Sequence, residues 1–262
     1  MEQKNKAFIE KVKSVVRKNF NESCEIYIDF EKRYNFFYEL AKNLSSFSQI
    51  KPDKDVLDAG CGCGFSTKAI SDNFSKRVIG IDISEKMVFT GKKLYPELDF
   101  IVADLFHIDK IFRKKFDYCI FNLVVFMLPE IREIFKKVYS KLTENGICAF
   151  SFYPEIINEQ KEDLLELAFK LTGFNKPKKF VISTLKECID SLKFAGFKNI
   201  KVLEYEINLK KDFLIDFFSI PAQSSSLFPK DDYSQRKAKV KKLFSAIAGN
   251  GKIIFKFVRG EK

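Results

Sequence analysis

The sequence predicts an α/β protein built on a mainly parallel sheet. From Lys54 onward, short apolar runs alternate with segments of helical periodicity, which is the pattern of consecutive strand–helix–strand units. The first apolar run leads into a glycine-rich turn, and the second ends in an aspartate. The chain has 262 residues, of which 46% are apolar, so we expect one large domain with a sizeable core.

Seven strands are expected from the apolar runs. Their ranges are 55–59, 77–82, 98–103, 116–122, 146–153, 199–207 and 252–258. Helical patterns lie between them at 65–74, 84–93, 129–143 and 184–195. The pair Asn145–Gly146 is a stop signal after the third helix, and Thr184 with Glu187 has the spacing of a capping box at the start of the fourth.

Three segments lie outside this alternation. Residues 1–50 are expected to form an N-terminal helical cap, with helices at 4–19 and 25–45, ahead of the main domain of residues 51–262. The insertions of the main domain fall at about 154–181 and 208–250. Long loops on an α/β scaffold usually cover or bind a ligand rather than fold alone. We therefore expect a single compact unit.

The composition limits the partners and the compartment only loosely. Lys and Arg outnumber Asp and Glu by 46 to 35, giving a formal charge of +11. That charge suits an acidic partner such as nucleic acid, a membrane surface or an anionic substrate. It is spread along the whole chain, however, which favours a general bias towards lysine. The sequence has no apolar run long enough for a membrane span and no secretory signal, so the cytoplasm is the expected location.

The cysteines do not suggest a metal site. Cys61 and Cys63 lie in the glycine-rich turn, and no second pair of cysteines or histidines completes a tetrahedral set. Their spacing also differs from the C-x-x-C of redox sites. We expect these thiols to be small side chains at the variable positions of a ligand-binding loop, and we expect no metal.

The turn itself has the composition of a cofactor loop. Gly60, Gly62 and Gly64 lie between an expected strand and an expected helix, where glycine lets the backbone turn tightly and approach a ligand. Asp82 ends the next strand, where nucleoside-binding folds place the carboxylate that holds the ribose. The spacing differs from the dinucleotide G-x-G-x-x-G. Asp58, just before the glycines, suits the cationic amino-acid end of S-adenosylmethionine better than a pyrophosphate.

The stretch Asp58-Ala-Gly-Cys-Gly-Cys-Gly64 resembles motif I of the class I S-adenosylmethionine-dependent methyltransferases. The other motifs of that family follow in order over about residues 50–207. The resemblance implies a Rossmann-like, seven-stranded sheet with strand order 3-2-1-4-5-7-6 and the last strand antiparallel. It also implies S-adenosylmethionine as cofactor, with S-adenosylhomocysteine as product, and a long insertion between the sixth and seventh strands.

The resemblance also assigns residues to the cofactor. Asp82 matches the ribose ligand, Ile83 and Met87 match the adenine-packing positions, and Asp104 matches the carboxylate that meets the adenine amino group. Tyr27, or alternatively Tyr34, would cover the cofactor from the N-terminal cap, although core packing is an equally good use for either. The expected cofactor-binding residues are Tyr27, Asp58, Gly60, Cys61, Gly62, Gly64, Asp82, Ile83, Met87, Asp104, Leu105 and Asn122.

A small-molecule acceptor fits the sequence best. The stretch from Asn122 to Pro129 is similar to the hydrophobic loop of the quinone-pathway C-methyltransferases and the malonyl-carrier O-methyltransferases. Candidate acceptor contacts are Phe126, Tyr153 and Phe228. Methyl transfer from a sulfonium is an in-line displacement that positioning alone can promote. We find no convincing catalytic residue, and the sequence predicts no oligomeric state.

Three alternatives remain open from the sequence. Nucleic-acid methylation suits the charge and the basic run 236–242, but Asn122-Leu-Val-Val lacks the proline and aromatic residue of base methyltransferases. The run can also be explained without nucleic acid, as the solvent-exposed face of a helix whose apolar side is Ala238, Val240 and Leu243. A non-catalytic S-adenosylmethionine-binding protein is the second alternative. Metalloid chemistry is the third, with Cys24 as the one thiol near an acceptor.

Overall fold

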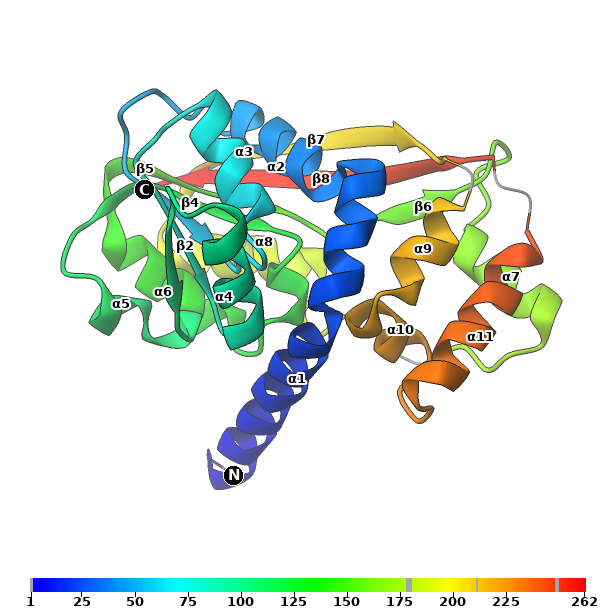
Figure 1. Cartoon of the computed structure of the whole chain (residues 1–262). Coiled ribbons are helices and arrows are strands. Elements are labelled where there is room, and N and C mark those ends of the chain that lie inside the picture. The colour runs from blue at the N-terminus through cyan, green and yellow to red at the C-terminus, as the bar shows by residue number, and fades with distance from the viewer. Residues whose placement is uncertain (1, 178–180, 211, 248–249) are drawn as a thin grey trace.

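The structure is a computed structural model that describes residues 2–177, 181–210, 212–247 and 250–262 (Figure 1). The strands are β1 Val56–Ala59, β2 Val78–Asp82, β3 Asp99–Val102, β4 Phe116–Asn122, β5 Leu142–Ser151, β6 Glu155–Ile157, β7 Lys198–Asn208 and β8 Lys252–Glu261. The α-helices are α1 Glu2–Tyr34, α2 Phe36–Phe47, α3 Phe65–Asn73, α4 Glu85–Leu94, α5 Ile108–Ile111, α6 Ile131–Lys141, α7 Leu164–Thr172, α8 Leu185–Ala195, α9 Phe213–Ser219, α10 Pro221–Leu227 and α11 Tyr233–Ser245. Two short 3₁₀ helices, η1 Leu105–His107 and η2 Val125–Met127, complete the elements.

The eight strands form one mixed sheet in the order β3-β2-β1-β4-β5-β8-β6, with β7 on the other edge of β8. Strand β8 runs antiparallel to β5, β6 and β7. The predicted α/β fold and its strand order are confirmed once the three-residue β6 is set aside. β6 is an eighth strand that the sequence did not predict. It lies in the first insertion and continues the edge of β8 beyond β5.

The parallel part of the sheet positions the site. β1 pairs with β2 and β4, β2 with β3, and β4 with β5, all in parallel. The carboxyl ends of these strands therefore meet at one edge of the sheet, which is where open α/β sheets bind ligands. The glycine loop follows β1, Asp82 ends β2 and Asn122 ends β4.

Helices cover both faces of the sheet because successive strand residues point to opposite faces. In β4, Tyr118 and Ile120 belong to the core cluster that includes α2, while Cys119 and Phe121 belong to the cluster beneath α5, α6 and α8. Helices α2 and α6 each bury one apolar side against the sheet, Phe37 and Leu40 in α2 and Ile134 and Val138 in α6. Within the described residues, no helix is both long and apolar enough to cross a membrane.

The N-terminal cap differs from the prediction. Instead of two helices at 4–19 and 25–45, α1 is one continuous helix of 33 residues, and the chain turns only at Asn35, which has a left-handed backbone (φ 49°). The Glu31 carboxylate accepts hydrogen bonds from the backbone amides of Phe37 and Tyr38, each at 2.8 Å. These two amides, in the first turn of α2, would otherwise lack a hydrogen-bond partner within the helix. The N-terminal end of α1 extends beyond the other elements in Figure 1.

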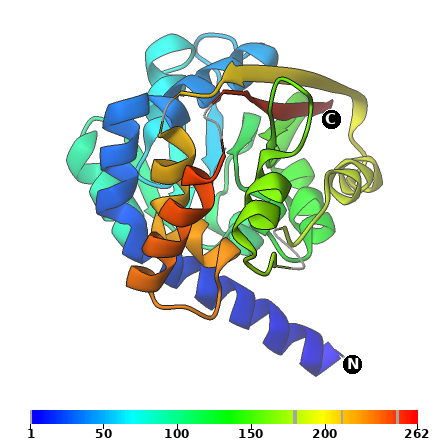
Figure 2. The ribbon, with the colours of Figure 1, turned by 90° about the vertical axis from the view of Figure 1, so that its right-hand side faces the viewer.

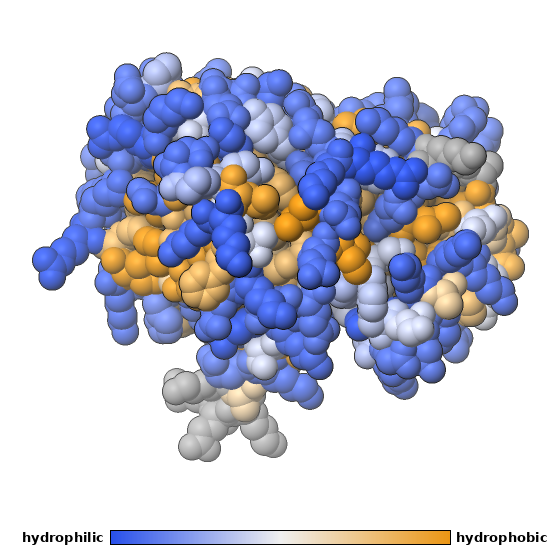
Figure 3. Space-filling view, in the orientation of Figure 1, coloured by the Kyte–Doolittle hydropathy of each residue, from blue (hydrophilic) through white to orange (hydrophobic). Residues whose placement is uncertain are grey.

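The insertions are helical and lie beside the cap. The first contributes β6 and α7, and the second contributes α9, α10 and α11. Figure 2 shows the helices of the second insertion packed beside α1 and under the far end of β7 and β8. Residues 178–180, 211 and 248–249 of these segments lie outside the described residues. Polar side chains cover most of the face in Figure 3, with apolar side chains gathered across its middle.

The predicted end of the third helix is wrong. α6 ends at Lys141, before Asn145–Gly146, and Leu142 already pairs with Phe116 of β4. Leu142 is 1% exposed, so its burial against the sheet favours extended backbone there. The left-handed backbone of Asn145 (φ 63°) falls within β5 rather than at a helix cap.

Candidate cofactor and acceptor site

The glycine loop is built from three residues with positive φ: 83° at Gly60, 55° at Gly62 and 87° at Gly64. A Cβ on Gly60 would lie 2.5 Å from a methyl group of Val124, and one on Gly64 would lie 2.5 Å from the ring of Phe100. A Cβ on Gly62 would meet only Tyr27, at 4.0 Å. Gly60 and Gly64 are therefore required by packing, whereas Gly62 presents an open backbone face.

Asp82 closes the loop from the neighbouring strand. Its carboxylate accepts hydrogen bonds from the backbone amides of Gly62 at 3.0 Å and Ser84 at 2.8 Å. Burial raises the pKa of this carboxyl group, and the two amides oppose that shift. A carboxylate has about four acceptor positions, so these bonds leave lone pairs for a ligand.

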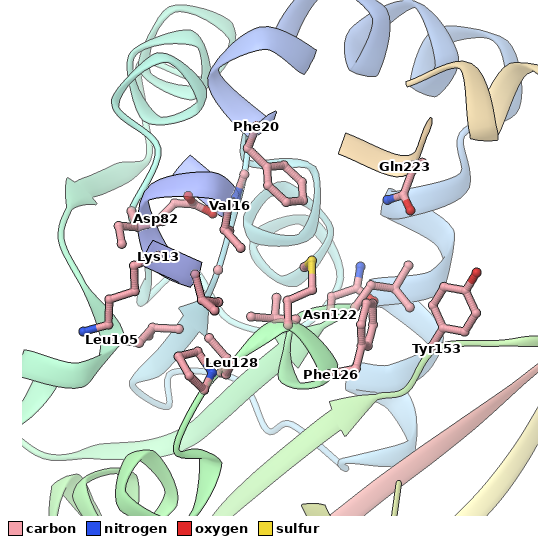
Figure 4. Close-up of a pocket in the computed structure, with 18 of the residues that line it drawn as sticks. Lys13, Val16, Phe20, Asp82, Leu105, Asn122, Phe126, Leu128, Tyr153 and Gln223 are labelled. Atoms are coloured by element: carbon pink, nitrogen blue, oxygen red, sulfur yellow. Dashed lines mark hydrogen bonds between the residues drawn. The ribbon is translucent and has the colours of Figure 1, made fainter. Parts of the chain in front are cut away.

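A pocket of about 1040 Å³, counting the open space at its mouth, lies over the loop (Figure 4). Ten predicted site residues line it: Tyr27, Gly60, Gly62, Asp82, Ile83, Asp104, Leu105, Asn122, Phe126 and Tyr153. They come from the ends of β1, β2 and β4, from the loops after β3 and β5, and from the cap. These ten residues therefore border one cavity at the carboxyl ends of the parallel strands, and their contact with a cofactor or acceptor stays a prediction.

The cap forms the roof of this pocket. Val12, Lys13, Val16 and Phe20 of α1 line it in addition to Tyr27. Lys13 forms an ion pair with Asp104 at 2.8 Å, and its side chain is 11% exposed. The sequence analysis missed these contacts, although the i, i+4, i+8 spacing of Val12, Val16 and Phe20 was a signal for one apolar helix face.

Comparison with known proteins matches the segment that contains the glycine loop. Residues 56–146 match a family model described as a methyltransferase domain. The chain is 24% identical over 168 residues to phosphoethanolamine N-methyltransferase 2 of Caenorhabditis elegans, a match over 62% of this chain and 37% of that protein. It is 26% identical over 196 residues to malonyl-[acyl-carrier protein] O-methyltransferase 1 of Ilyobacter polytropus, over 71% of this chain and 68% of that protein.

Residues 56–146 match the methyltransferase-domain family, and the relatives over a wider part of the chain are methyltransferases by name, as the sequence motifs predicted. The predicted family is thereby confirmed. A solved structure of Haemonchus contortus phosphoethanolamine N-methyltransferase 2, in complex with phosphomonomethylethanolamine and S-adenosylhomocysteine, has the same fold, with a TM-score of 0.53 at 17% identity. That match covers 87% of this chain and 52% of the other. The chain thus spans only about half of that structure, and 37% of the C. elegans relative.

Five predicted residues of this methyltransferase fold do not line the pocket. They are Asp58, Cys61, Gly64, Met87 and Phe228. Met87 is fully buried beneath the loop, with its sulfur 3.0 Å from that of Cys63. Phe228 packs against Phe169 and Phe174 of the first insertion, so the second insertion instead supplies the pocket with residues of α9 and α10.

Asp58 lies behind the loop rather than in the pocket. Its Oδ2 accepts hydrogen bonds from the hydroxyl groups of Ser66 at 2.5 Å and Thr67 at 2.6 Å, at the start of α3. Its Oδ1 is buried and has no hydrogen-bond partner among the described residues. Burial raises the pKa of Asp58 to about 6. In this structure Asp58 fixes the loop onto α3, and its predicted contact with the cofactor stays a prediction.

Tyr27 stacks on the rings of Phe37 and Phe65, at centroid distances of 4.1 and 5.9 Å. Burial, with several nearby acidic groups, raises the pKa of its hydroxyl group, which therefore stays neutral. Tyr34 does not line the pocket; its hydroxyl group donates to Asp216 of α9 at 2.8 Å. Of the two candidate tyrosines, Tyr27 is the one placed against the glycine loop.

Hydrogen bonds hold the cap on both sides of the pocket. Asn21 accepts the hydroxyl hydrogen bond of Ser84, at 2.7 Å, and the amide of Lys86, at 3.2 Å, at the start of α4. On the other side, Asn19 donates to the hydroxyl group of Ser225 at 2.9 Å, in α10. α1 therefore connects the methyltransferase domain to its second insertion directly above the pocket.

The remaining cysteines and the basic run lie away from the pocket. All six thiols are free and buried, Cys24 included, and no group of three metal-binding side chains occurs in the described part of the chain. In α11, Val240 and Leu243 are buried as expected, whereas Ala238 is exposed, which corrects the predicted apolar side. Arg236 is instead the buried residue, at 9% exposure, beside Tyr233.

Proposed function

We propose that this chain is an S-adenosylmethionine-dependent methyltransferase that acts on a small molecule. The observation that carries the proposal is that Gly62 and the Asp82 carboxylate lie side by side and both line the pocket covered by α1. Asp82 accepts a hydrogen bond from the amide of Gly62, and Gly62 leaves space on its pocket side. The family supports the cofactor, and the enclosed pocket supports a small acceptor.

The residues of the pocket fit this cofactor. Asp82 has free acceptor positions for ribose hydroxyl groups, and Gly62 leaves room for a ligand to lie against the loop. Ile83 and Leu105 are apolar residues that line the pocket, and they would pack against adenine. Asp104 binds Lys13 and the amide of Phe106, one through each oxygen, so it too keeps acceptor positions that would be free for the adenine amino group.

When bound, S-adenosylmethionine supplies a methyl group on a positively charged sulfur, ready for in-line displacement. The contribution of this chain is to hold the two reactants in line, since fixing reactants in the right geometry can supply several kcal/mol of a barrier. Asp82, Tyr27 and the glycine loop would fix the cofactor, while Phe126 would enclose the acceptor and exclude water.

A small acceptor is supported by two independent observations. α1 and α10 both line the pocket and are joined by the hydrogen bond between Asn19 and Ser225, so the described residues cover the pocket on this side, which suits a small acceptor. Of the relatives named above, one is named for methylating phosphoethanolamine, which is a small molecule, whereas the other is named for a malonyl group attached to a carrier protein. Neither name assigns the acceptor of this chain.

The test is to follow the methyl group. The protein is incubated with methyl-labelled S-adenosylmethionine and either a low-molecular-weight cell extract or total RNA, and the label in each fraction is counted. We expect label in the small-molecule fraction with the wild type and a large loss with Asp82→Ala. Label in RNA would support the nucleic-acid alternative. Cofactor binding without any transfer would support the non-catalytic alternative.

A further inference from the structure

One edge of the sheet is a long strand that pairs on one side. β7 has 11 residues, whereas β3, at the opposite edge, has four. β7 pairs with β8, and within the described residues no strand lies on its other side. In Figure 2, β7 (yellow) lies above β8 (dark red) at the top of the molecule. The outer backbone groups of such an edge strand form a template for pairing with another chain.

The outward-facing backbone groups of β7 belong to its even-numbered residues. Directly after the strand, the amide of Leu209 donates to the carbonyl of Gly251 at 2.9 Å, in the same register as the β7–β8 pairs. In an antiparallel ladder, alternate residues form hydrogen bonds with the same neighbouring strand. The odd-numbered residues of β7 therefore bond to β8, and the even-numbered residues present their amides and carbonyls at the outer edge.

Residues 201–208 carry few of the features that usually protect an edge strand. Proteins block such edges with proline, bulges, outward charges or a covering helix. The ladder between β7 and β8 is regular throughout residues 201–208, and its one irregularity lies before them. Glu204 binds Lys256 of β8, and Glu206 binds Lys252 of β8. Both carboxylates are therefore held against β8 instead of reaching across the outer edge.

Apolar side chains are exposed on both faces of this edge. Val202 is 51% exposed, and Leu203 is 45% exposed. Because successive strand residues point to opposite faces, the helices of the protein cover neither face at this point. Packing between apolar side chains on adjacent strands contributes roughly 0.2–1 kcal/mol for each pair. The edge thus offers a partner strand both backbone hydrogen bonds and side-chain packing.

A second copy of β7 can pair with this edge only in certain registers. Two copies related by a two-fold axis pair antiparallel, so the residue on the axis fixes which residues lie opposite each other. An axis at Glu204 or Glu206 places two identical carboxylates opposite each other, and an axis at Tyr205 places Glu204 opposite Glu206. Like charges in opposite positions destabilise a strand pair. These three registers are therefore disfavoured.

An axis at Leu203 avoids this repulsion. It places the two Leu203 side chains opposite each other on one face, and Lys201 opposite the ring of Tyr205 of the second copy. All of these residues lie in the regular part of the strand. An axis at Val202 would instead bring the irregular stretch before Lys201 into the ladder. Leu203 is therefore the centre that suits both the charges and the geometry of β7.

We propose that this chain forms a two-fold dimer in which β7 of each copy pairs antiparallel with β7 of the other, centred on Leu203. The two sheets then form one continuous sheet. No described residue of β7 lines the pocket, so the pocket stays accessible in the dimer. The inference is independent of the proposed function, because it depends on the strand edge alone.

Sedimentation velocity tests the dimer. We expect the wild type to change from monomer to dimer between about 1 and 100 µM. Leu203→Lys replaces an apolar pair on the axis by two like charges, so it should weaken association about tenfold. Phe89→Lys changes a similarly exposed apolar residue, on α4, and should associate like the wild type. A wild type that stays monomeric at about 100 µM overturns the proposal, and so does a dimer that Leu203→Lys leaves unchanged.

Disulfide trapping tests the register. The six native thiols are buried, so an added surface cysteine is the reactive one. On the axis, the two residues 203 would form a pair without mutual hydrogen bonds, with Cα atoms about 4.5 Å apart, which is within disulfide range. Oxidised glutathione would take up the two thiol hydrogens and leave as two reduced molecules, joining the two copies of Leu203→Cys.

Glu206→Cys is the matched control for this cross-link, because it places a cysteine on the same strand but away from the axis. We expect a covalent dimer from Leu203→Cys and monomer from Glu206→Cys on a non-reducing gel. Equal cross-linking of both variants, or of neither, overturns the pairing centred on Leu203.

Discussion

Two neighbouring glycines of the cofactor loop should respond in opposite ways to the same substitution. Gly62→Ala and Gly64→Ala each add one methyl group at a position with positive φ, 55° and 87° respectively. At Gly62 the new methyl group would enter open space beside Tyr27, on the pocket side of the loop. At Gly64 it would lie 2.5 Å from the ring of Phe100, inside the protein. The first change should mainly affect binding and the second mainly stability.

The magnitudes follow from these distances. A left-handed backbone costs an L-residue about 1–2 kcal/mol, which applies to both variants. Gly64→Ala must also displace the Phe100 ring, and overpacking of this kind adds about 1–3 kcal/mol. We therefore expect a Tm loss of about 2–8 °C for Gly62→Ala and roughly twice that for Gly64→Ala, given about 2–4 °C per kcal/mol for a domain of about this size.

Cofactor affinity should follow the reverse order. The added methyl group of Gly62→Ala occupies the face on which the ligand is expected to lie, so we expect the Kd for S-adenosylmethionine to rise at least about tenfold, a loss of about 1.4 kcal/mol. Folded Gly64→Ala should retain affinity within about threefold, because its methyl group points away from the pocket. Calorimetry below both melting temperatures measures the two values. Wild-type affinity in Gly62→Ala would refute the placement of the cofactor against this loop.

Three further predictions concern the groups around the pocket. Lys13→Met removes the ion pair that joins the cap to Asp104, so the free energy of unfolding should fall by about 1 kcal/mol; equal urea midpoints would contradict this. Asn21→Ala removes the acceptor of the Ser84 hydroxyl group, so amide exchange in residues 12–20 should become about tenfold faster. Unchanged exchange would show that other contacts hold the cap. Asp58→Asn should change the pH dependence of stability. Burial raises the pKa of Asp58 to about 6, above the ~3.9 of an unfolded aspartate. Because the folded state therefore binds the proton more tightly, the contribution of Asp58 to wild-type stability falls as the pH rises from 4 to 6. Relative to the variant, the wild type should lose about 2 kcal/mol between pH 4 and pH 7, and a constant difference in urea denaturation would contradict the burial argument.

The cofactor end of the site could be predicted because its determinants are local in the sequence. A strand, a glycine turn and a helix follow one another within a few residues, and the parallel pairing of β1 with β2 then places Asp82 beside Gly62. Backbone sterics and parallel topology leave few other arrangements for such a sequence. The predicted strand order follows from the same family pattern.

The acceptor end could not be predicted in this way, because it is formed by contacts between distant segments. Asn19 and Ser225 are 206 residues apart in the sequence, yet their hydrogen bond places α10 against α1. Such packing decides that Gln223 lines the pocket while Phe228 packs in the insertion. The abundance of phenylalanine added to the difficulty, since 30 residues of this type give no single one a distinctive signal.

The continuous cap helix has a similar explanation. Residues 20–24 include Asn21, Glu22 and Ser23, which resemble a break between two helices. In the structure Asn21 and Ser23 bind α4 and α10 through their side chains, so tertiary contacts keep this stretch helical. The turn occurs instead at Asn35, whose side chain type tolerates the left-handed backbone.

The most direct test of the account is calorimetric binding of S-adenosylmethionine to the wild type and to Asp82→Ala. We predict a Kd well below about a millimolar for the wild type, the upper end of usual enzyme–substrate values, and a loss of at least about tenfold in the variant. Asp216→Ala, which changes a carboxylate of α9 that binds Arg33 and Tyr34 outside the pocket, is the control and should bind normally. A wild-type Kd weaker than about a millimolar, with no further loss in Asp82→Ala, would contradict the proposed site and its cofactor.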